Sequence, residues 1–244
     1  MKVAILSDIH GNMQALESVM KDINKNGCEK VLCLGDLAMA GPEPSKVIDF
    51  VKSQSNWTVI QGNTDKMIAD FSPEILKNTE RVFPVMAHAL ADDVLFLLDD
   101  RKEYLKNLPA QKELKIEGVK ILMVHGSPRR NNEDILPDMP IAQIEEIIKG
   151  VSADLVFCGH THIPAGYQTS TKQTVVNVGS VGRPMTKDAK SCYCIANFDN
   201  GSFSIEHRLL DYDREKAAEI MRSRAFDGAE KLAEMILHPT SRHV

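Results

Sequence analysis

The chain has 244 residues, of which 43% are hydrophobic and 26% charged, so it can bury the core of a globular domain. Its formal net charge of −5 argues against a large nucleic-acid surface and against an anionic membrane surface as its partner. No segment approaches the roughly 18 consecutive apolar residues of a membrane span, and Asp8 interrupts the first apolar segment too early for a secretion signal. The five cysteines include no Cys-x-x-Cys pair, which favours reduced thiols and a cytoplasmic location.

Short apolar segments alternate with helix-like segments over residues 1–60. Residues 3–6, 31–34 and 57–60 are rich in β-branched and aliphatic side chains, which is typical of strands buried on both faces. Amphipathic segments at 13–26 and 44–54 lie between them, and Asn12 is a suitable N-cap for the first of these. This alternation predicts a largely parallel sheet joined by helical connections.

The rest of the chain predicts more helices and a second group of strands. Residues 72–108 read as helical, and the side chains expected to line their core-facing side are Leu95, Leu97, Leu98, Tyr104, Leu105 and Leu108. Further buried strands are expected at 121–124 and 155–158, and antiparallel strands at 174–178, 192–198 and 202–208. Asn200-Gly201 between the last two is a strong hairpin signal.

Residues 213–238 predict two helices that are broken at Asp227-Gly228. No linker, repeat or low-complexity segment divides the chain. We therefore expect a single domain over residues 1–244, in which residues 211–244 form a C-terminal helical extension.

Five of the expected strands are each followed by an Asp, Asn or His, usually beside a glycine. These candidate metal ligands are Asp8, His10, Asp36, Asn63, His125, His160 and His162. In open α/β sheets, the loops beyond the carboxyl ends of the strands converge on one crevice, so we expect these side chains to meet there.

Carboxylate, amide and imidazole groups together suit divalent Mn, Fe, Zn, Co or Ni. Seven ligands are too many for one tetrahedral ion, and they suffice for two ions that share a bridging carboxylate. Each motif alone has an ordinary explanation, because Gly-Asp and Gly-Asn are usually turns and a single His is usually solvated. Five such motifs in order, all at strand ends, indicate a metal centre.

The ordered motifs Asp8-x-His10, Gly35-Asp36, Gly62-Asn63, His125-Gly126 and Gly159-His160-Thr161-His162 resemble those of the calcineurin-like metallophosphoesterases. Residues 177–184 also resemble a loop of the small bacterial and archaeal phosphodiesterase branch, which includes diadenosine-tetraphosphatase-like proteins. The resemblance runs from Met1 to about Leu210. It implies an α/β (α+β) fold, a four-layer αββα sandwich of two mixed β-sheets flanked by helices, with the metal site at the C-terminal strand ends.

The resemblance also implies the role of each ligand. Asp8, His10 and His162 would hold the first metal, Asn63, His125 and His160 the second, and Asp36 would bridge the two. The implied reaction is hydrolysis of a small phosphorylated substrate by a hydroxide that bridges the two metals. The resemblance also allows a homo-oligomer.

Thr64 departs from the family pattern, in which a histidine often follows the metal-binding asparagine. Threonine has no pKa near 7, so general-acid assistance worth roughly 10²–10⁴-fold has to be absent or supplied elsewhere. We therefore expect phosphodiesters or phosphoanhydrides to be better substrates than alkyl monoesters. Asp65 matches the acidic position of that motif, and we expect it to orient Asn63 or a ligating histidine by a hydrogen bond. The candidate catalytic residues are thus Asp36, Asn63 and Asp65.

Three further residues are candidates for binding substrate. Arg129 and Arg183 suit bidentate phosphate contact, with a solvated loop position as the alternative for each. Asn12 follows the first ligand pair, where it could contact phosphate, cap the helix, or do both. Two other functions stay open for the whole chain: a metal-binding scaffold or regulatory protein that has lost catalysis, and a binding protein without metal.

Overall fold

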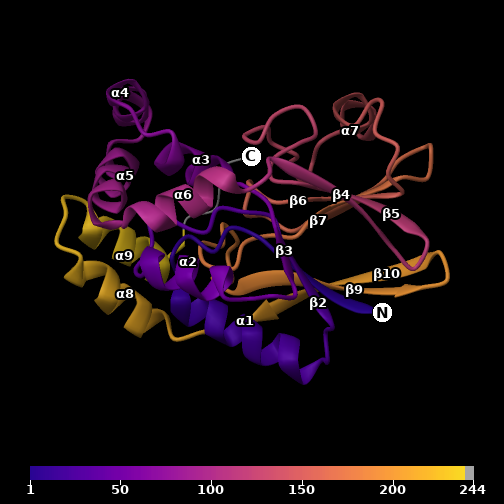
Figure 1. The fold of residues 1–244 in the computed structure, drawn as a ribbon, viewed down its shortest axis with the longest axis horizontal. Coiled ribbons are helices and arrows are strands. Elements are labelled where there is room, and N and C mark those ends of the chain that lie inside the picture. The colour runs from indigo at the N-terminus through magenta and orange to yellow at the C-terminus, as the bar shows by residue number, and fades with distance from the viewer. Residues whose placement is uncertain (240–244) are drawn as a thin grey trace.

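Two five-stranded mixed sheets form the centre of the protein (Figure 1) in a computed structural model that describes residues 1–239. The first sheet has the order β10-β9-β1-β2-β3 and the second the order β4-β5-β6-β8-β7. The first sheet comprises β1 (Lys2–Leu6), β2 (Lys30–Cys33), β3 (Trp57–Val59), β9 (Ser191–Asp199) and β10 (Ser202–Leu210). The second comprises β4 (Gln111–Ile116), β5 (Val119–Val124), β6 (Leu155–Cys158), β7 (Ala165–Gln168) and β8 (Thr174–Asn177).

Each sheet contains three neighbouring parallel strands and two antiparallel strands. In the first sheet β1, β2 and β3 are parallel, as the sequence predicts, while β9 runs antiparallel to β1 and β10 to β9. In the second sheet β5, β6 and β8 are parallel, with β4 and β7 antiparallel at the two edges. The carboxyl ends of the parallel strands therefore open onto loops that can form a site.

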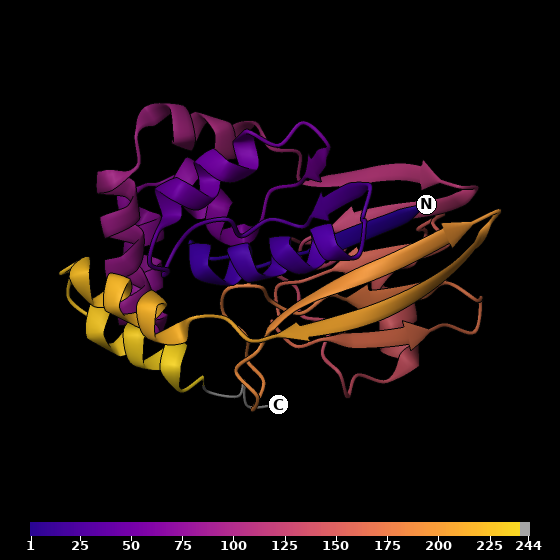
Figure 2. The same ribbon diagram turned by 90° about the horizontal axis from the view of Figure 1, so that it is seen from below.

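Helices cover the outer faces of the sheets and fill one end of the molecule (Figures 1 and 2). They are α1 (Met13–Lys25), α2 (Pro44–Lys52), α3 (Asn63–Ala69), α4 (Pro73–Val82), α5 (Pro84–Phe96), α6 (Asp99–Asn107), α7 (Ile141–Ile147), α8 (Arg214–Ser223) and α9 (Ala229–Leu237). In both views α8 and α9 lie beside α5, at the end away from the hairpin of β9 and β10. No helix among residues 1–239 is long and apolar enough to cross a membrane.

Alternate side chains of the central strands show the four layers. In β1, Val3 and Ile5 enter the apolar cluster between the sheets, whereas Ala4 and Leu6 belong to the cluster that α1 and α2 cover. In β6, Val156 and Cys158 pack in the same way with the side chains of α7. Strands buried on both faces need apolar side chains at every position, which is why these segments read as continuous apolar runs. The expected αββα sandwich is confirmed.

The turn signals in the sequence also hold in the structure. Asn12 caps α1, its Oδ1 accepting the Ala15 N–H at 3.1 Å. Asn200 and Gly201 join β9 to β10 with φ angles of 45° and 84°, the positive values that a tight hairpin requires. The C-terminal helices are broken at Gly228, whose φ is 98°.

The expected core side of residues 72–108 is partly wrong. Leu97 and Leu105 are buried, but Leu95 and Leu98 are 76% and 61% exposed. The error has a local cause: α5 ends at Phe96 and Leu97 is extended, so the helical periodicity does not continue across this point. Four short elements, β4, β7, α3 and α7, are not predicted by the sequence patterns.

The C-terminal helices pack onto the body of the protein. Ala218, Met221 and Leu232 belong to the apolar cluster that also contains Leu16 of α1. The division into one domain with an extension over 211–244 stays a prediction, and its last part, residues 240–244, lies outside the described residues.

Candidate metal centre

Five of the seven candidate ligands have left-handed backbone. The φ angles are 56° for Asp8, 46° for His10, 54° for Asp36, 66° for His160 and 62° for His162. A non-glycine residue in this region costs roughly 1–3 kcal/mol and persists only where its surroundings hold it. Hydrogen bonds between the loops do so, because the N–H groups of Asp8 and His10 donate to the carbonyls of Gly35 and Asp36 at 3.0 and 2.9 Å.

Two glycines let the loops approach closely. A Cβ on Gly62 would lie 2.0 Å from Oδ1 of Asp36, and one on Gly159 would lie 2.6 Å from Oδ2 of Asp8. Both distances are far below van der Waals contact. The glycines that precede Asn63 and His160 are therefore needed to bring these ligands beside the carboxylates.

The first cluster of ligand atoms joins the two sheets. Nε2 of His162 lies 3.2 Å from Oδ1 of Asp8 and 3.2 Å from Nε2 of His10, and all three side chains are buried. Asp8 and His10 follow β1 of the first sheet, whereas His162 follows β6 of the second. This is the set that the family resemblance implies for the first metal.

The second cluster lies around His125. Its Nε2 lies 3.0 Å from Oδ1 of Asn63, 3.3 Å from Oδ2 of Asp36 and 3.8 Å from Oδ1 of Asp8. Oδ2 of Asp36 also lies 3.6 Å from Nε2 of His10. Asp36 therefore lies near histidines of both clusters, and Asp8, whose Oδ1 also lies within 3.8 Å of His10, does so too.

Three of the histidines present Nε2 to the site because their Nδ1 atoms are occupied. Nδ1 lies 3.0 Å from the Met39 carbonyl in His10, and 2.6 Å from the Arg183 carbonyl in His162. In His125 it lies 2.8 Å from the Leu34 carbonyl. A carbonyl can only accept, so Nδ1 carries a proton, and Nε2 is the atom that can offer a lone pair to a cation.

The ligand atoms of the first cluster suit a bound cation. The Nε2 lone pairs of His10 and His162 face each other at 3.2 Å, and the buried Oδ1 of Asp8 has no hydrogen-bond partner among the described residues. Acceptors that converge in this way repel one another unless positive charge lies between them. Burial lowers the pKa of His125, yet Asp36 and Asp8 outweigh burial and raise it to about 10. The carboxylates thus require a proton or a metal ion beside them.

His160 lies at the edge of the centre. Its ring is 5.5 Å from the ring of His125, and its Nε2 is 3.4 Å from Oδ1 of Asp134. The loop that carries it is held by Asn177, which the sequence analysis did not single out as a site residue. Nδ2 of Asn177 donates to the Gly159 carbonyl at 2.8 Å and to Thr161 Oγ1 at 2.9 Å. Asn177 ends an apolar strand, so the signal that found the ligands could have found it too.

Asp65 supports Asp36 rather than Asn63 or a histidine, which corrects the expected hydrogen bond. Its carboxylate is fully buried and accepts backbone N–H groups of Asp36, Leu37 and Gly62 at 2.8–2.9 Å. Burial and the Asp36 carboxylate raise the pKa of Asp65 to about 7, while these N–H groups oppose the shift. In the structure it acts on the backbone that carries the ligands.

Thr64 does not supply the proton donor that a histidine would supply at its position. Its hydroxyl donates to the Ala38 carbonyl at 3.0 Å, and its N–H donates to Oδ1 of Asp36 at 2.8 Å. Thr64 therefore contributes to holding the loops together.

The three candidate substrate-binding residues lie in different surroundings. Asn12 uses Oδ1 to cap α1 and Nδ2 to donate to the Gly182 carbonyl at 2.9 Å, which favours the capping role. Arg129 is 46% exposed and makes a two-pronged ion pair with Glu133. Arg183 is the one beside the candidate metal centre, since it lines a pocket together with His10. Burial lowers the pKa of its guanidinium, and Asp36 and Asp8 oppose that shift.

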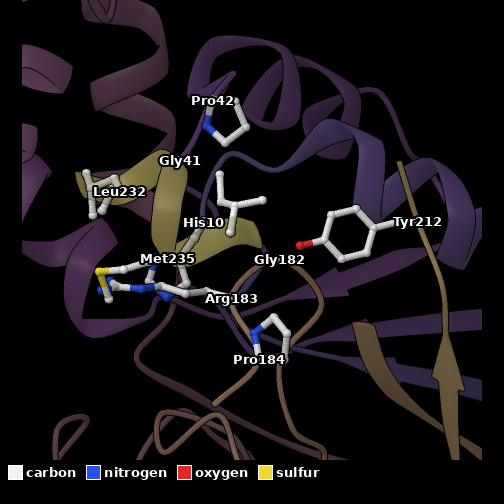
Figure 3. Close-up of a pocket in the computed structure, with 11 residues that line it drawn as sticks. His10, Gly41, Pro42, Gly182, Arg183, Pro184, Tyr212, Leu232 and Met235 are labelled. Carbon is white, nitrogen blue, oxygen red and sulfur yellow. The ribbon is translucent and has the colours of Figure 1, made fainter. Parts of the chain in front are cut away.

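A small pocket beside the centre contains Arg183 (Figure 3). His10 and the residues around Gly41 and Gly182 form one side of it, while Leu232 and Met235 of α9 form another. Among residues 1–239 the Arg183 side chain makes one hydrogen bond, to Sδ of Met86 at 3.3 Å. A thioether is a weak acceptor, so most donors of this guanidinium are available to a ligand.

The sequence profile of the calcineurin-like phosphoesterase superfamily domain matches residues 1–201. The chain belongs to this superfamily. It is accordingly a metal-dependent phosphoesterase, a hydrolase with the fold described above.

Similar proteins match over nearly the whole chain. An uncharacterized protein of Methanocaldococcus jannaschii is 29% identical over 233 residues, covering 89% of this chain and 90% of that protein. The crystal structure of a hypothetical protein from Pyrococcus horikoshii OT3 has a TM-score of 0.86 and 25% identity, with 99% of each chain covered. A metallophosphoesterase from Sphaerobacter thermophilus shares the fold, with a TM-score of 0.77, 22% identity and 98% of each chain covered.

Proposed function

We propose that this phosphoesterase uses two divalent ions to hydrolyse a phosphodiester or a phosphoanhydride of a small substrate. The convergence of acceptors at Asp8, His10 and His162 carries the proposal, because a cation is what relieves it. The mixed oxygen and nitrogen ligands suit Mn, Fe, Zn, Co or Ni. Two such ions would supply an activated water nucleophile and stabilise the charge that develops on phosphate oxygens.

The chain's own residues divide the remaining work. Asp36 is the proposed bridge, with Asp8, His10 and His162 on one side and Asn63, His125 and His160 on the other. Arg183 is proposed to bind a phosphate oxygen, since its guanidinium is charged at any working pH and, within residues 1–239, donates only to a thioether. Asp65 keeps the Asp36 backbone in its left-handed conformation and so acts as a positioning residue.

The proposed substrate class follows from Thr64. Its hydroxyl is committed to a backbone carbonyl, and it has no pKa near neutrality, so it cannot protonate a leaving group. Diesters with good leaving groups and anhydrides need little protonation as the bond breaks. Alkyl monoesters need more, and we expect them to be poor substrates.

The test is manganese-supplemented hydrolysis of bis(p-nitrophenyl) phosphate by the native protein and by Asp36→Asn. We expect kcat/KM to fall at least about 100-fold in the variant, because the proposed bridge loses a charge that faces both clusters. Asp70→Asn at the C-cap of α3 is the control, since that exposed carboxylate pairs with Lys66.

The same assay distinguishes the alternatives. A clear preference for an alkyl monoester would overturn the proposed substrate class. Manganese binding without turnover of any phosphoester would favour a metal-binding scaffold instead. Equal turnover by the native protein and Asp36→Asn would place the reaction outside this centre.

A further inference from the structure

The loop between β2 and α2 carries two successive non-glycine residues with left-handed backbone, Met39 and Ala40, at φ angles of 76° and 62°. Such a pair is unfavourable on its own and persists only where other groups hold it. The carbonyl of Met39 also accepts the Nδ1 proton of His10 at 3.0 Å. Whatever holds this strained loop therefore also sets the orientation of the His10 ring.

Asp93 of α5 and Arg224 at the end of α8 hold the loop on either side of Ala40. The fully buried carboxylate of Asp93 accepts the Met39 N–H at 2.8 Å through Oδ2 and the Arg224 Nη2 at 2.5 Å through Oδ1. Nη1 of Arg224 donates directly to the Gly41 carbonyl at 2.6 Å. Arg224 thus holds Met39 indirectly, through Asp93, and it holds Gly41 directly, through the carbonyl of that residue.

The loop has no room to move independently of His10. A Cβ on Gly41 would lie 1.4 Å from the His10 carbonyl oxygen, so the two backbones are in direct contact. The Gly11 N–H donates to the Leu37 carbonyl at 2.8 Å, and its carbonyl accepts the Glu43 N–H at 2.7 Å. A displacement of the loop would therefore displace the metal ligand.

An arginine is suited to this position. Its side chain is 10% exposed, it also pairs with Asp92, and its guanidinium carbon lies 5.2 Å from the centre of the Phe226 ring. The planar guanidinium presents several donors in a fixed fork, so one side chain can bind two carboxylates and a carbonyl at once. A lysine ammonium keeps the charge without this geometry.

We propose that Arg224, acting through Asp93, is a positioning residue for the metal centre, which orients His10 by holding the Met39–Gly41 backbone. This role lies outside the part of the chain that matches the family, residues 1–201, and it gives the C-terminal helices a function in catalysis. It rests on the proposed function, in which His10 is a metal ligand.

The experiment measures Mn²⁺ affinity by titration calorimetry, with circular dichroism of the metal-free proteins as a check on folding. We expect Arg224→Met to weaken Mn²⁺ binding about 10–100-fold, the usual effect of losing a residue that orients a ligand. Arg224→Lys, which keeps a cation beside Asp92 and Asp93, should lose less. Arg222→Met is the matched control, because Arg222 on the same helix pairs with Glu230 and Glu234 within the C-terminal helices.

The variant His10→Ala distinguishes a failure of the proposed metal site from a failure of the proposed role of Arg224. If His10→Ala weakens binding and both Arg224 variants bind as tightly as the native protein, the role of Arg224 is overturned and the metal site stands. If His10→Ala binds like the native protein, the site itself fails and the role of Arg224 fails with it. Should Arg224→Met not fold, Arg224→Lys decides alone: weaker binding than in Arg222→Met supports the proposal, and equal binding overturns it.

Discussion

At the scale of single residues, backbone strain marks the candidate metal centre. Twelve non-glycine residues among 1–239 have positive φ, and seven of them are either candidate ligands or the adjoining Met39 and Ala40. This concentration is informative because each such residue needs compensation from its neighbours. Here the compensation comes from buried carboxylates, Asp65 at one end of the β2–α2 loop and Asp93 at the other.

Replacing Asp65 by Asn should disturb the centre without removing a ligand. Asp65 accepts three backbone N–H groups with two oxygens, and an amide offers only one oxygen. We expect Asp65→Asn to lower the free energy of unfolding of the metal-free protein by about 1–3 kcal/mol, because buried N–H groups lose their acceptor. Urea unfolding measures this, and Mn²⁺ affinity should fall as well. Native-like values for both would show that Asp65 does not hold the loop.

At the scale of elements, one partly buried ion pair fastens α1 to the edge of the first sheet. Asp22 of α1 accepts from Nε of Arg208 on β10 at 3.0 Å and from the Tyr193 hydroxyl on β9 at 2.8 Å. The Arg208 guanidinium, with help from Tyr193, holds the pKa of Asp22 below its ordinary value, although burial opposes the shift. α1 is capped by Asn12 and directly follows the first ligand loop, so its attachment positions that loop.

A lowered carboxyl pKa gives a definite pH dependence. The stability that Asp22 contributes is present above its unfolded pKa of 3.8 and is lost as the pH falls below this toward the folded pKa. We expect Asp22→Asn to lower the free energy of unfolding at pH 7 by about 1–2 kcal/mol, and to converge with the native protein below pH 4. Urea unfolding across this range tests it. Asp211→Asn, which removes an 82% exposed partner of Lys190, should change little, and a difference that persists at low pH would contradict the assignment.

At the scale of the whole molecule, the candidate centre takes its ligands from both sheets. Asp8, His10, Asp36 and Asn63 belong to loops after β1, β2 and β3, whereas the three other ligands follow β5 and β6. Besides the apolar cluster between the sheets, hydrogen bonds cross this boundary, such as that from the His160 N–H to Oδ2 of Asp8 at 3.0 Å, and Nε2 of His162 lies 3.2 Å from Oδ1 of Asp8. A bound cation would therefore couple the sheets.

Metal should accordingly stabilise the fold. A ligand at 100 times its Kd stabilises the native state by about 2.7 kcal/mol, which corresponds to a rise in Tm of roughly 5–10 °C for a protein of this size. We expect that rise on adding Mn²⁺ to the chelator-treated protein, measured by calorimetry. The rise should be smaller in His162→Ala and unchanged in His88→Ala, whose ring contacts Asp227 instead. Equal shifts in both variants would contradict a metal site at His162.

Eight of the ten strands among residues 1–239, and the candidate ligands with their chemical type, can be predicted from the sequence alone. Buried strands are continuous apolar runs, and the ligands follow them directly, so both signals are local. The helix ends within residues 72–108 are harder to predict from the sequence. α5 ends at Phe96, and Leu95 and Leu98, on either side of this end, are exposed rather than buried in the core.

How the ligands are held depends on contacts that form only in the folded chain. The carbonyls that receive the Nδ1 protons, the three N–H groups of Asp65 and the contact of Arg224 with Asp93 join residues far apart in the chain. These partners are set by how helices and loops pack, and backbone carbonyls and N–H groups carry no residue-specific signal in a sequence. The ligands can therefore be predicted from strand ends, whereas the groups that orient them become known only when the chain is folded.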